Sequence, residues 1–312
     1  MNEVNIKTLI TPPSLNAGDR VRIVSPSRSI TLEEILPAAE WLRQHGFRVE
    51  YGKTIGKIDG QFAGSDEERA NDFQDALHDD GVRAIWCARG GYGAARILTK
   101  IDFSILRQSP KWIIGFSDIT AIHAAVYLQN IISMHAPMPI NFKNSIETSI
   151  SLGLMLTILR GKTMPLEWDS SPFNRPGIAT GRVWGGNLSV IYSLRGTPYD
   201  IDINETILML EDIDEYLYHI DRMINNLQLG GNFNPKAMIV GQFTDMHDNT
   251  IPFGKNAYEI VSEYTKSQTL KAATFNAPFG HVDYNLPLLI GAEATLNVGT
   301  KRTTLMYHVG TF

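Results

Sequence analysis

The sequence predicts an α/β fold in which an N-terminal domain built on a parallel sheet is followed by a smaller mixed α/β domain. In the first half, short apolar segments alternate with segments of helical spacing, which is typical of successive βαβ units. Near the end of the chain, strand-like segments follow one another directly, which favours antiparallel pairs. The length of 312 residues also suits two modest domains better than one large core.

The first half contains short apolar segments that we expect to be strands, at 21–24, 48–51, 84–87, 112–114 and 131–134. Segments with helical spacing separate them, at 31–45, 65–78, 91–100 and 118–129. The helix at 65–78 begins with a capping box, because Ser65 is a good N-cap and Glu68 follows three residues later. This alternation predicts a parallel sheet of the flavodoxin-like type.

The segment 161–180 is polar and lacks periodicity, so we expect it to connect a domain at 1–160 with a domain at 181–312. In the second domain we expect strands and helices in alternation at first, and strands alone at the end. The strands are expected at 206–210, 236–243, 286–298 and 303–308, and the helices at 218–229 and 257–266. Gly230 and Gly231 form a C-cap signal for the first of these helices.

Composition argues against several classes of function. The net charge is −5 and no run of Lys or Arg occurs, so nucleic acid is not an expected partner. The single cysteine, Cys87, allows neither an internal disulfide nor a Cys-rich zinc site, and its apolar neighbours predict a buried strand residue. Acidic clusters lack paired histidines at ligand spacing, so we expect no metal.

The N-terminal residues lack the pattern of a signal peptide, and no apolar stretch reaches the roughly 18 residues that a membrane span needs. We therefore expect a cytoplasmic protein that makes no membrane contact.

Ser117 lies in the turn Gly115–Asp118, between an expected strand and an expected helix. A serine on such a turn can expose its hydroxyl over the carboxyl end of the sheet, and the amide of Asp118 can stabilise an oxyanion. The match to the G-x-S-x-G elbow is incomplete, because Ile119 occupies the position of the second glycine. Taken alone, the turn favours a helix N-cap over a nucleophile.

The turn Arg89–Gly93 contains three glycines and follows another expected strand. Its backbone can approach a ligand closely and present free amides to negative charge. The dinucleotide pattern G-x-G-x-x-G fails because Arg96 occupies the third glycine position, so no nucleotide cofactor is expected. The turn is either an oxyanion donor or only a tight turn.

A histidine base and an acid to orient it are harder to choose from chemistry alone. Among the eight histidines, His281 lies in a loop between expected strands, and His135 ends a strand near the carboxyl edge of the sheet. Glu211 ends the apolar strand at 206–210 and can orient an imidazole. The same turn contains further acids that remain candidates: Asp212, Asp214 and Glu215.

Taken together, these segments resemble the L,D-carboxypeptidase family, which also includes microcin-immunity peptidases. Each segment is short, but their order and spacing are specific. In order they are Leu15–Pro26, Arg89–Gly93, Gly115–Thr120, Gly185–Leu188, Leu210–Asp212, Asp221–Arg222 and Gly280–His281. One departure is Ala136, where the family often has glycine between His and Pro.

The resemblance implies a Ser-Glu-His triad with Ser117 as nucleophile, His281 as base and Glu211 as its orienter. It implies an oxyanion hole made by backbone amides, for which Gly91 and Asp118 are the matching positions. It also implies a homodimer and no cofactor. For substrate binding we expect the side chains of Arg89, Asn187 and Arg222, with either arginine as the ligand of the substrate carboxylate.

The reaction that the resemblance implies is release of the terminal D-alanine from a muropeptide tetrapeptide in peptidoglycan recycling. Members that cleave aminoacyl-nucleotide toxins tend to carry a longer loop near the residue that matches Glu211, and the short form here favours the cell-wall peptide. One alternative is a microcin-immunity-type peptidase acting on a peptidyl- or aminoacyl-nucleotide. The other is a non-catalytic two-domain protein that closes on a peptide.

Overall fold

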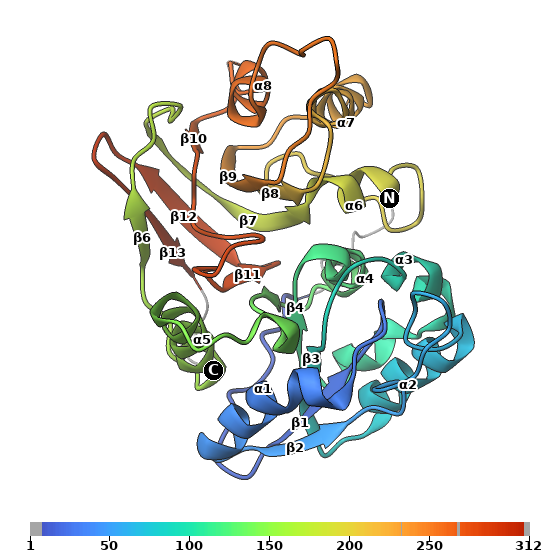
Figure 1. Cartoon of the computed structure of the whole chain (residues 1–312). Helices are drawn as coiled ribbons and strands as arrows, with labels where there is room; N and C mark the ends of the chain where they lie inside the picture. Colours follow the sequence, from blue (N-terminus) through green and yellow to red (C-terminus); the bar gives the residue numbers. More distant parts are fainter. Residues whose placement is uncertain (1–7, 232, 267–268, 309–312) are drawn as a thin grey trace, which may run out of the picture.

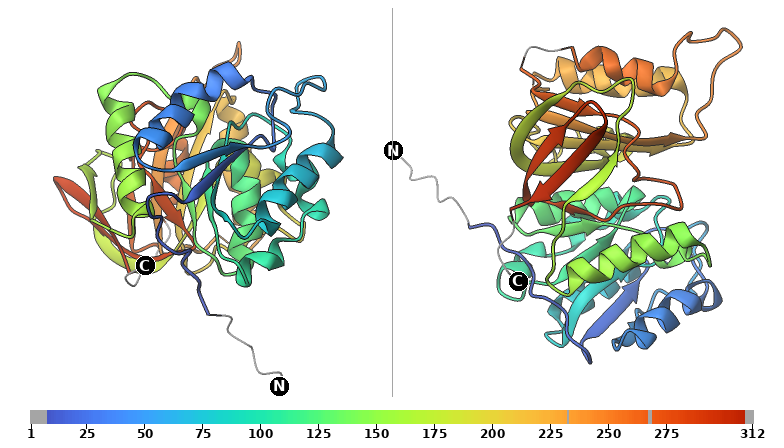
Figure 2. Two further views of the ribbon diagram at one scale, coloured as in Figure 1. Left: turned by 90° about the horizontal axis from the view of Figure 1, so that it is seen from below. Right: turned by 90° about the vertical axis from the view of Figure 1, so that its left-hand side faces the viewer.

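A computed structural model describes residues 8–231, 233–266 and 269–308. The chain forms two sheets, and Figures 1 and 2 show the N-terminal and C-terminal parts lying against each other. The first residues, on which the prediction about a signal peptide partly depends, lie outside the described ranges. No helix in the described ranges is long and apolar enough to span a bilayer.

The first sheet is parallel except at one edge, which confirms the predicted fold class. Its strand order is β11-β5-β4-β3-β1-β2, and only β11 pairs antiparallel to its neighbour. The strands are β1 (Arg20–Val24), β2 (Arg48–Tyr51), β3 (Val82–Cys87), β4 (Trp112–Gly115), β5 (Ser133–His135) and β11 (Leu288–Ile290). Cys87 is buried in β3, as its apolar neighbours predict.

The first helices of this part connect successive strands of the first sheet, as in βαβ units, and the last α-helix leads to the second sheet. The helices are α1 (Leu32–Gln44), α2 (Asp66–His78), α3 (Ala94–Ile97), α4 (Thr120–Leu128) and α5 (Ile146–Leu159), with short 3-10 helices η1 (Leu98–Lys100), η2 (Phe103–Arg107), η3 (Ser117–Ile119) and η4 (Pro139–Asn141). The predicted capping box of α2 is present, with the amide of Glu68 donating to Ser65 Oγ at 3.2 Å. The helix predicted at 91–100 begins only at Ala94, because Gly91 and Gly93 adopt positive φ.

The second sheet is mixed, with strand order β10-β9-β8-β7-β12-β13-β6. Its strands are β6 (Leu166–Asp169), β7 (Gly177–Asn187), β8 (Ile207–Ile213), β9 (Ala237–Thr244), β10 (Ala272–Thr274), β12 (Glu293–Val298) and β13 (Arg302–Tyr307). Strands β7 to β10 pair in parallel, whereas β12, β13 and β6 pair antiparallel. The helices are α6 (Leu188–Ser193), α7 (Leu217–Leu229) and α8 (Ala257–Tyr264).

Two details differ from the expected elements. The segment 161–180, expected to be an irregular connection, contains β6 and the start of β7, and β6 pairs with β13. The single strand expected at 286–298 is two strands in different sheets, because the chain turns at Gly291 with φ 86°. As a result, β11 returns from the C-terminal part to the first sheet. The division at 160 and 181 stays a prediction.

Helix α4 makes a close contact between the two parts. A Cβ on Gly186 of β7 would lie 2.5 Å from Thr120 Oγ1, so only glycine allows this approach. The same hydroxyl oxygen accepts a hydrogen bond from the amide of Asn187 at 3.1 Å. The end of β7 is therefore fixed directly beside the segment that carries Ser117.

Candidate active site

Ser117 is the first residue of η3, directly after the loop residue that follows β4, and has a φ of 63°. Positive φ is uncommon for a residue with a side chain and typically costs on the order of 1–3 kcal/mol. Gly115 permits the turn, because a Cβ there would lie 3.0 Å from Ile119 Cγ1. Ser117 does not cap the helix, since no side-chain cap bond occurs at the start of η3 or α4. Its hydroxyl is free for other partners.

That hydroxyl belongs to a chain of hydrogen bonds between three distant segments. Ser117 Oγ lies 3.0 Å from His281 Nε2, and His281 Nδ1 lies 2.7 Å from Glu211 Oε2. Glu211 is completely buried, while the His281 side chain is 16% exposed. A hydroxyl, an imidazole and a carboxylate in this order are the arrangement that activates a serine for acyl transfer.

The environment of His281 sets its proton affinity. Burial disfavours the imidazolium, but the charge of Glu211 and its hydrogen bond outweigh burial, so the pKa of His281 is raised above its ordinary value. A base with this partner can accept the serine proton and hold it as a stabilised cation.

Glycine and an asparagine hold the His281 loop in place. A Cβ on Gly280 would lie 3.0 Å from both Cβ and Oε2 of Glu211. The amide of Gly280 donates to Asn285 Oδ1 at 3.0 Å, and the amide of Asn285 donates to Ser151 Oγ on α5 at 3.0 Å. The loop is thus attached to the N-terminal part of the molecule, beside Ser117.

The glycine turn lies against the nucleophile turn. A Cβ on Gly90 would lie 3.0 Å from Ser117 Cβ and 3.3 Å from the amide nitrogen of Asp118. Gly91 has a φ of 104°, and no described residue accepts a hydrogen bond from its amide. Both amides expected to form the oxyanion hole, those of Gly91 and Asp118, therefore belong to segments in contact with Ser117.

The side chain of Asp118 has a role that the sequence did not indicate. Its buried carboxylate accepts hydrogen bonds from the amide of Ala94 at 2.8 Å and from Ser27 Oγ at 2.6 Å. Burial raises the pKa of this carboxyl group. The carboxyl group joins the nucleophile turn to the glycine turn and to the loop after β1.

Two buried carboxyl groups at the end of β8 serve different partners. Asp212 accepts from Asn187 Nδ2 at 2.9 Å and from the amide of Ser189 at 2.8 Å, whereas Glu211 contacts His281. Burial, with the neighbouring charge of Glu211, raises the pKa of Asp212 to about 7. The structure thus brings Glu211, and not Asp212, to the imidazole.

A cavity of about 540 Å³ opens at these residues, between the glycine turn, the nucleophile turn, His281 and the ends of β7 and β8. Its volume is that of a site for a small organic ligand. Two cations line it, Arg28 and Arg89. Its acidic residues are Asp118, Asp212, Asp214 and Glu215.

The expected substrate-binding residues fall in different places. Asn187 lines the cavity as the N-cap of α6, its Oδ1 accepting from the amide of Val190. Arg89 lines it as well and donates to the carbonyl of Ser29 at 3.1 Å. Arg222 is not brought to this cavity. It is exposed on α7, with its guanidinium 5.2 Å from the centre of the Tyr218 ring.

Arg28 and His135 show where sequence reasoning was incomplete. Arg28 lines the cavity from the loop after β1, and its place at the carboxyl end of a parallel strand was the available signal. His135 does not line the cavity. It is buried behind Phe116 with Nε2 3.3 Å from Asn285 Oδ1, and burial lowers its pKa to about 3.

No group of three or more His, Cys, Asp or Glu side chains suited to a metal ion is found within residues 8–231, 233–266 and 269–308. Ser117, His281, Glu211 and the backbone amides beside them are the groups at the cavity that can carry out acyl transfer. The two-sheet fold and this site are those of a serine peptidase.

Comparison with known proteins identifies the family. Residues 21–136 match the LD-carboxypeptidase N-terminal domain, and residues 180–296 match the LD-carboxypeptidase C-terminal domain. The chain belongs to the LD-carboxypeptidase family, as its sequence segments predict.

Relatives of both predicted kinds occur. A probable murein peptide carboxypeptidase of Bacillus subtilis is 32% identical over 308 residues, covering 94% of this chain and 93% of the relative. The microcin C7 self-immunity protein MccF of Escherichia coli is 25% identical over 326 residues, covering 93% of this chain and 94% of the relative. The crystal structure of muramoyltetrapeptide carboxypeptidase from Oxalobacter formigenes has a TM-score of 0.84 at 25% identity, covering 94% of this chain and 100% of that one.

Proposed function

We propose that this protein is a serine L,D-carboxypeptidase that releases the terminal D-alanine from muropeptide tetrapeptides in peptidoglycan recycling. The observation that carries the proposal is the hydrogen-bonded series Ser117–His281–Glu211 at a cavity of ligand size. The murein peptide carboxypeptidase among the relatives supports this substrate class.

In the proposed mechanism, Ser117 Oγ attacks the carbonyl carbon of the last peptide bond while His281 Nε2 takes the hydroxyl proton. The amides of Gly91 and Asp118 donate to the oxyanion that forms. Losing one such donor typically costs about 3–4 kcal/mol of transition-state stabilisation. The intermediate then collapses, the C–N bond breaks, and His281 returns the proton to the leaving amine.

The acyl-enzyme is resolved by the reverse sequence. Water enters where the amine has left, His281 accepts its proton, and the second tetrahedral intermediate expels Ser117 with that proton. Glu211 holds the imidazole with Nδ1 protonated, and its charge stabilises the cation that appears in each step. Arg28, Arg89 and Asn187, which line the cavity, are proposed to bind the part of the substrate that stays on the enzyme.

The decisive experiment replaces the nucleophile. Ser117→Ala is expected to lower the rate of D-alanine release from a tetrapeptide by about ten-thousand-fold or more, because no other hydroxyl takes its place. Ser193→Ala, on an exposed face of α6, is the control and should keep wild-type activity. Substantial turnover by the Ser117 variant would remove the triad from the mechanism.

The relative MccF favours a second candidate, a peptidase that acts on a peptidyl- or aminoacyl-nucleotide. Here the turn between β8 and α7 is short, with only residues 214–216 between Ile213 and Leu217. By the resemblance, this form suits the cell-wall peptide. Turnover of a tetrapeptide and of an aminoacyl-sulfamoyl nucleotide, measured side by side, separates the two. The hydrogen-bonded serine argues against a purely peptide-binding protein.

We also propose that the enzyme works in the cytoplasm, and that it forms the homodimer that the resemblance implies. Light scattering should then give twice the chain mass of 34.8 kDa. Fractionation of cells that produce the protein should find it with cytoplasmic markers. A monomer at working concentration, or recovery outside the cytoplasm, contradicts the respective part.

A further inference from the structure

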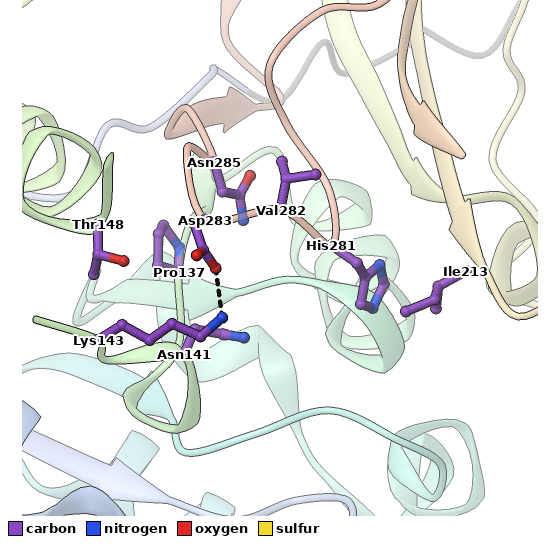
Figure 3. A pocket seen from close by; sticks show the side chains of 9 residues that line it. All are labelled: Pro137, Asn141, Lys143, Thr148, Ile213, His281, Val282, Asp283 and Asn285. Atoms are coloured by element: carbon purple, nitrogen blue, oxygen red, sulfur yellow. Dashed lines mark hydrogen bonds and ion pairs between the residues drawn. The ribbon is translucent and has the colours of Figure 1, made fainter. Parts of the chain in front are cut away.

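A second, smaller cavity lies beside His281. It measures about 230 Å³ and adjoins the larger cavity, with which it shares Asn141, Ile213 and His281. Figure 3 shows its side chains, with His281 and Ile213 at one side and Thr148 at the other. At about 30 Å³ per water molecule, the space corresponds to about eight waters, which suits a small amino acid rather than a longer peptide.

The wall of this cavity carries one cation and one unpartnered donor. Lys143 Nζ lies 2.7 Å from Asp283 Oδ1, and Figure 3 marks this ion pair. The Lys143 side chain is 62% exposed, so its ammonium keeps donors for another acceptor. Asn285 is 1% exposed, and its Nδ2 has no hydrogen-bond partner among the described residues. A buried amide without an acceptor is costly, so it indicates a missing partner.

The chemistry of the reaction decides what enters this cavity. A general acid must reach the leaving amine, so the amine lies within hydrogen-bond distance of His281 Nε2. The leaving residue therefore extends from His281, away from the glycine turn that receives the oxyanion. The small cavity lies on that side. Arg28 and Arg89 line only the larger cavity, together with Gly90 and Gly91.

We propose that the small cavity is the leaving-group subsite, and that Lys143 Nζ and Asn285 Nδ2 bind the free carboxylate of the terminal residue. The inference rests on the proposed function and names the group that makes the enzyme an exopeptidase. Lys143, and neither Arg89 nor Arg222, is then the ligand of the substrate carboxylate. Asp283 then competes with the substrate carboxylate for the ammonium group of Lys143. Its negative charge also repels that carboxylate and weakens its binding.

The test compares two substrates in four proteins. One tetrapeptide ends in D-alanine as the free acid, and the other ends in D-alaninamide. The proteins are the wild type, Lys143→Met, Asp283→Asn and Lys53→Met. The last is a matched control, because Lys53 also forms an exposed ion pair, with 2.6 Å between its Nζ and Asp75 Oδ2. Neither residue of this pair lines the small or the larger cavity.

The wild type should prefer the acid, and Lys143→Met should lower kcat/KM for the acid by about 10- to 100-fold, the range expected for losing a charged hydrogen bond. It should leave the amide substrate nearly unchanged, so the acid-to-amide ratio falls. Asp283→Asn should lower KM for the acid. Lys53→Met should leave kcat/KM unchanged for both substrates.

The outcomes separate the subsite from the function. If the wild type releases D-alanine but Lys143→Met keeps the wild-type ratio, the subsite is wrong and the proposed function stands. If Lys143→Met and Asp283→Asn lower kcat/KM equally for the acid and the amide substrate, the ion pair only supports the His281 loop. The proposed subsite is then wrong as well. A wild type that releases no D-alanine from the acid overturns both.

Discussion

At the scale of single residues, the site depends on close approaches that only glycine permits. Gly90 is the clearest case, because a Cβ there would lie 3.0 Å from Ser117 Cβ and 3.1 Å from Ser117 Oγ. Its own φ is not positive, so the backbone conformation suits alanine, but the added Cβ would crowd Ser117 and the amide nitrogen of Asp118, 3.3 Å away.

Gly90→Ala is therefore expected to lower kcat by about 10- to 100-fold, since small displacements of a nucleophile are costly. The free energy of unfolding should fall by about 1–3 kcal/mol, the usual cost of overpacking. Gly153→Ala is the control, because a Cβ there meets nothing within 4 Å and alanine favours the helix α5 by about 1 kcal/mol. Assays of D-alanine release measure kcat, and urea unfolding measures the free energy of unfolding, for both variants. A Gly90 variant that is fully active contradicts the close contact with Ser117.

The contact between Glu211 and His281 predicts how kcat/KM depends on pH. The base must be neutral to act, and the pKa of His281 is raised, so kcat/KM should rise with pH through a limb above about 6.5. In Glu211→Gln the charge that raises the pKa is gone while burial still lowers it. The limb should then move to lower pH, and the maximal rate should fall by about a thousand-fold or more.

A pH–rate profile of both proteins tests this shift. If the limb of Glu211→Gln moves to higher pH, the charge of Glu211 does not set the pKa of His281. Asp212→Asn, next along β8, is the companion variant. It should move the limb to lower pH by less than Glu211→Gln does, because the charge of Asp212 raises the pKa of His281 less than Glu211 does and Asp212 makes its hydrogen bonds with Asn187 and Ser189.

The same pair shows the limit of sequence reasoning for single residues. Chemistry alone could not choose between Glu211 and Asp212, which are both carboxylates at one strand end. Successive strand residues point to opposite faces, and the register of β8 against β9 shifts between Leu210 and Asp212. Which carboxylate meets His281 is therefore decided by pairing with β9, a contact that is distant in sequence. The resemblance supplied Glu211.

At the scale of elements, local signals predicted most of the first sheet. Its strands are short apolar segments, and α1 and α2 begin with capping boxes, so sequence and structure agree to within a few residues for β1 to β4. The helix α5 was not predicted. Its apolar residues are spread around the helix and mixed with Ser and Thr, and its position depends on packing and on a cap from Ser145.

Elements that depend on distant partners were also missed. Strand β6 has only four residues, and its alternating burial makes sense only once it pairs with β13. The apolar run at 286–298 gave no local sign that Gly291 would divide it between two sheets. That division matters for function, because β11 brings the end of the His281 loop to β5.

At the scale of the whole molecule, the site exists only where the two parts meet. Ser117 comes from the first sheet, whereas Glu211 and His281 come from the second part of the chain. The sequence predicted this shared site through the order of the family segments. The sequence did not indicate which residues hold the parts together: the contact of Thr120 with Gly186 and Asn187 is between two of the family segments, but other contacts are made by residues outside them.

Arg182 on β7 is one such contact. Its Nε donates to the carbonyl of Gly291 at 3.0 Å, and its Nη1 donates to Asn130 Oδ1 at 2.9 Å. Its guanidinium also lies 4.1 Å from the centre of the Tyr127 ring, at the end of α4. One side chain of the second sheet thus binds both the helix after Ser117 and the turn before β12.

Arg182→Met is expected to lower the free energy of unfolding by about 1–3 kcal/mol, because it leaves partly buried acceptors without their donor. It should also lower kcat, since Ser117 and His281 are no longer held as firmly at hydrogen-bond distance. Arg302→Met is the control, because Arg302 is 66% exposed on β13 and pairs only with surface acids. Urea unfolding and D-alanine release measure the two effects. If Arg182→Met lost stability but kept full kcat, the contact would hold the fold without aligning the site, and the alignment of Ser117 with His281 would have to come from the loop anchored by Asn285 and Ser151.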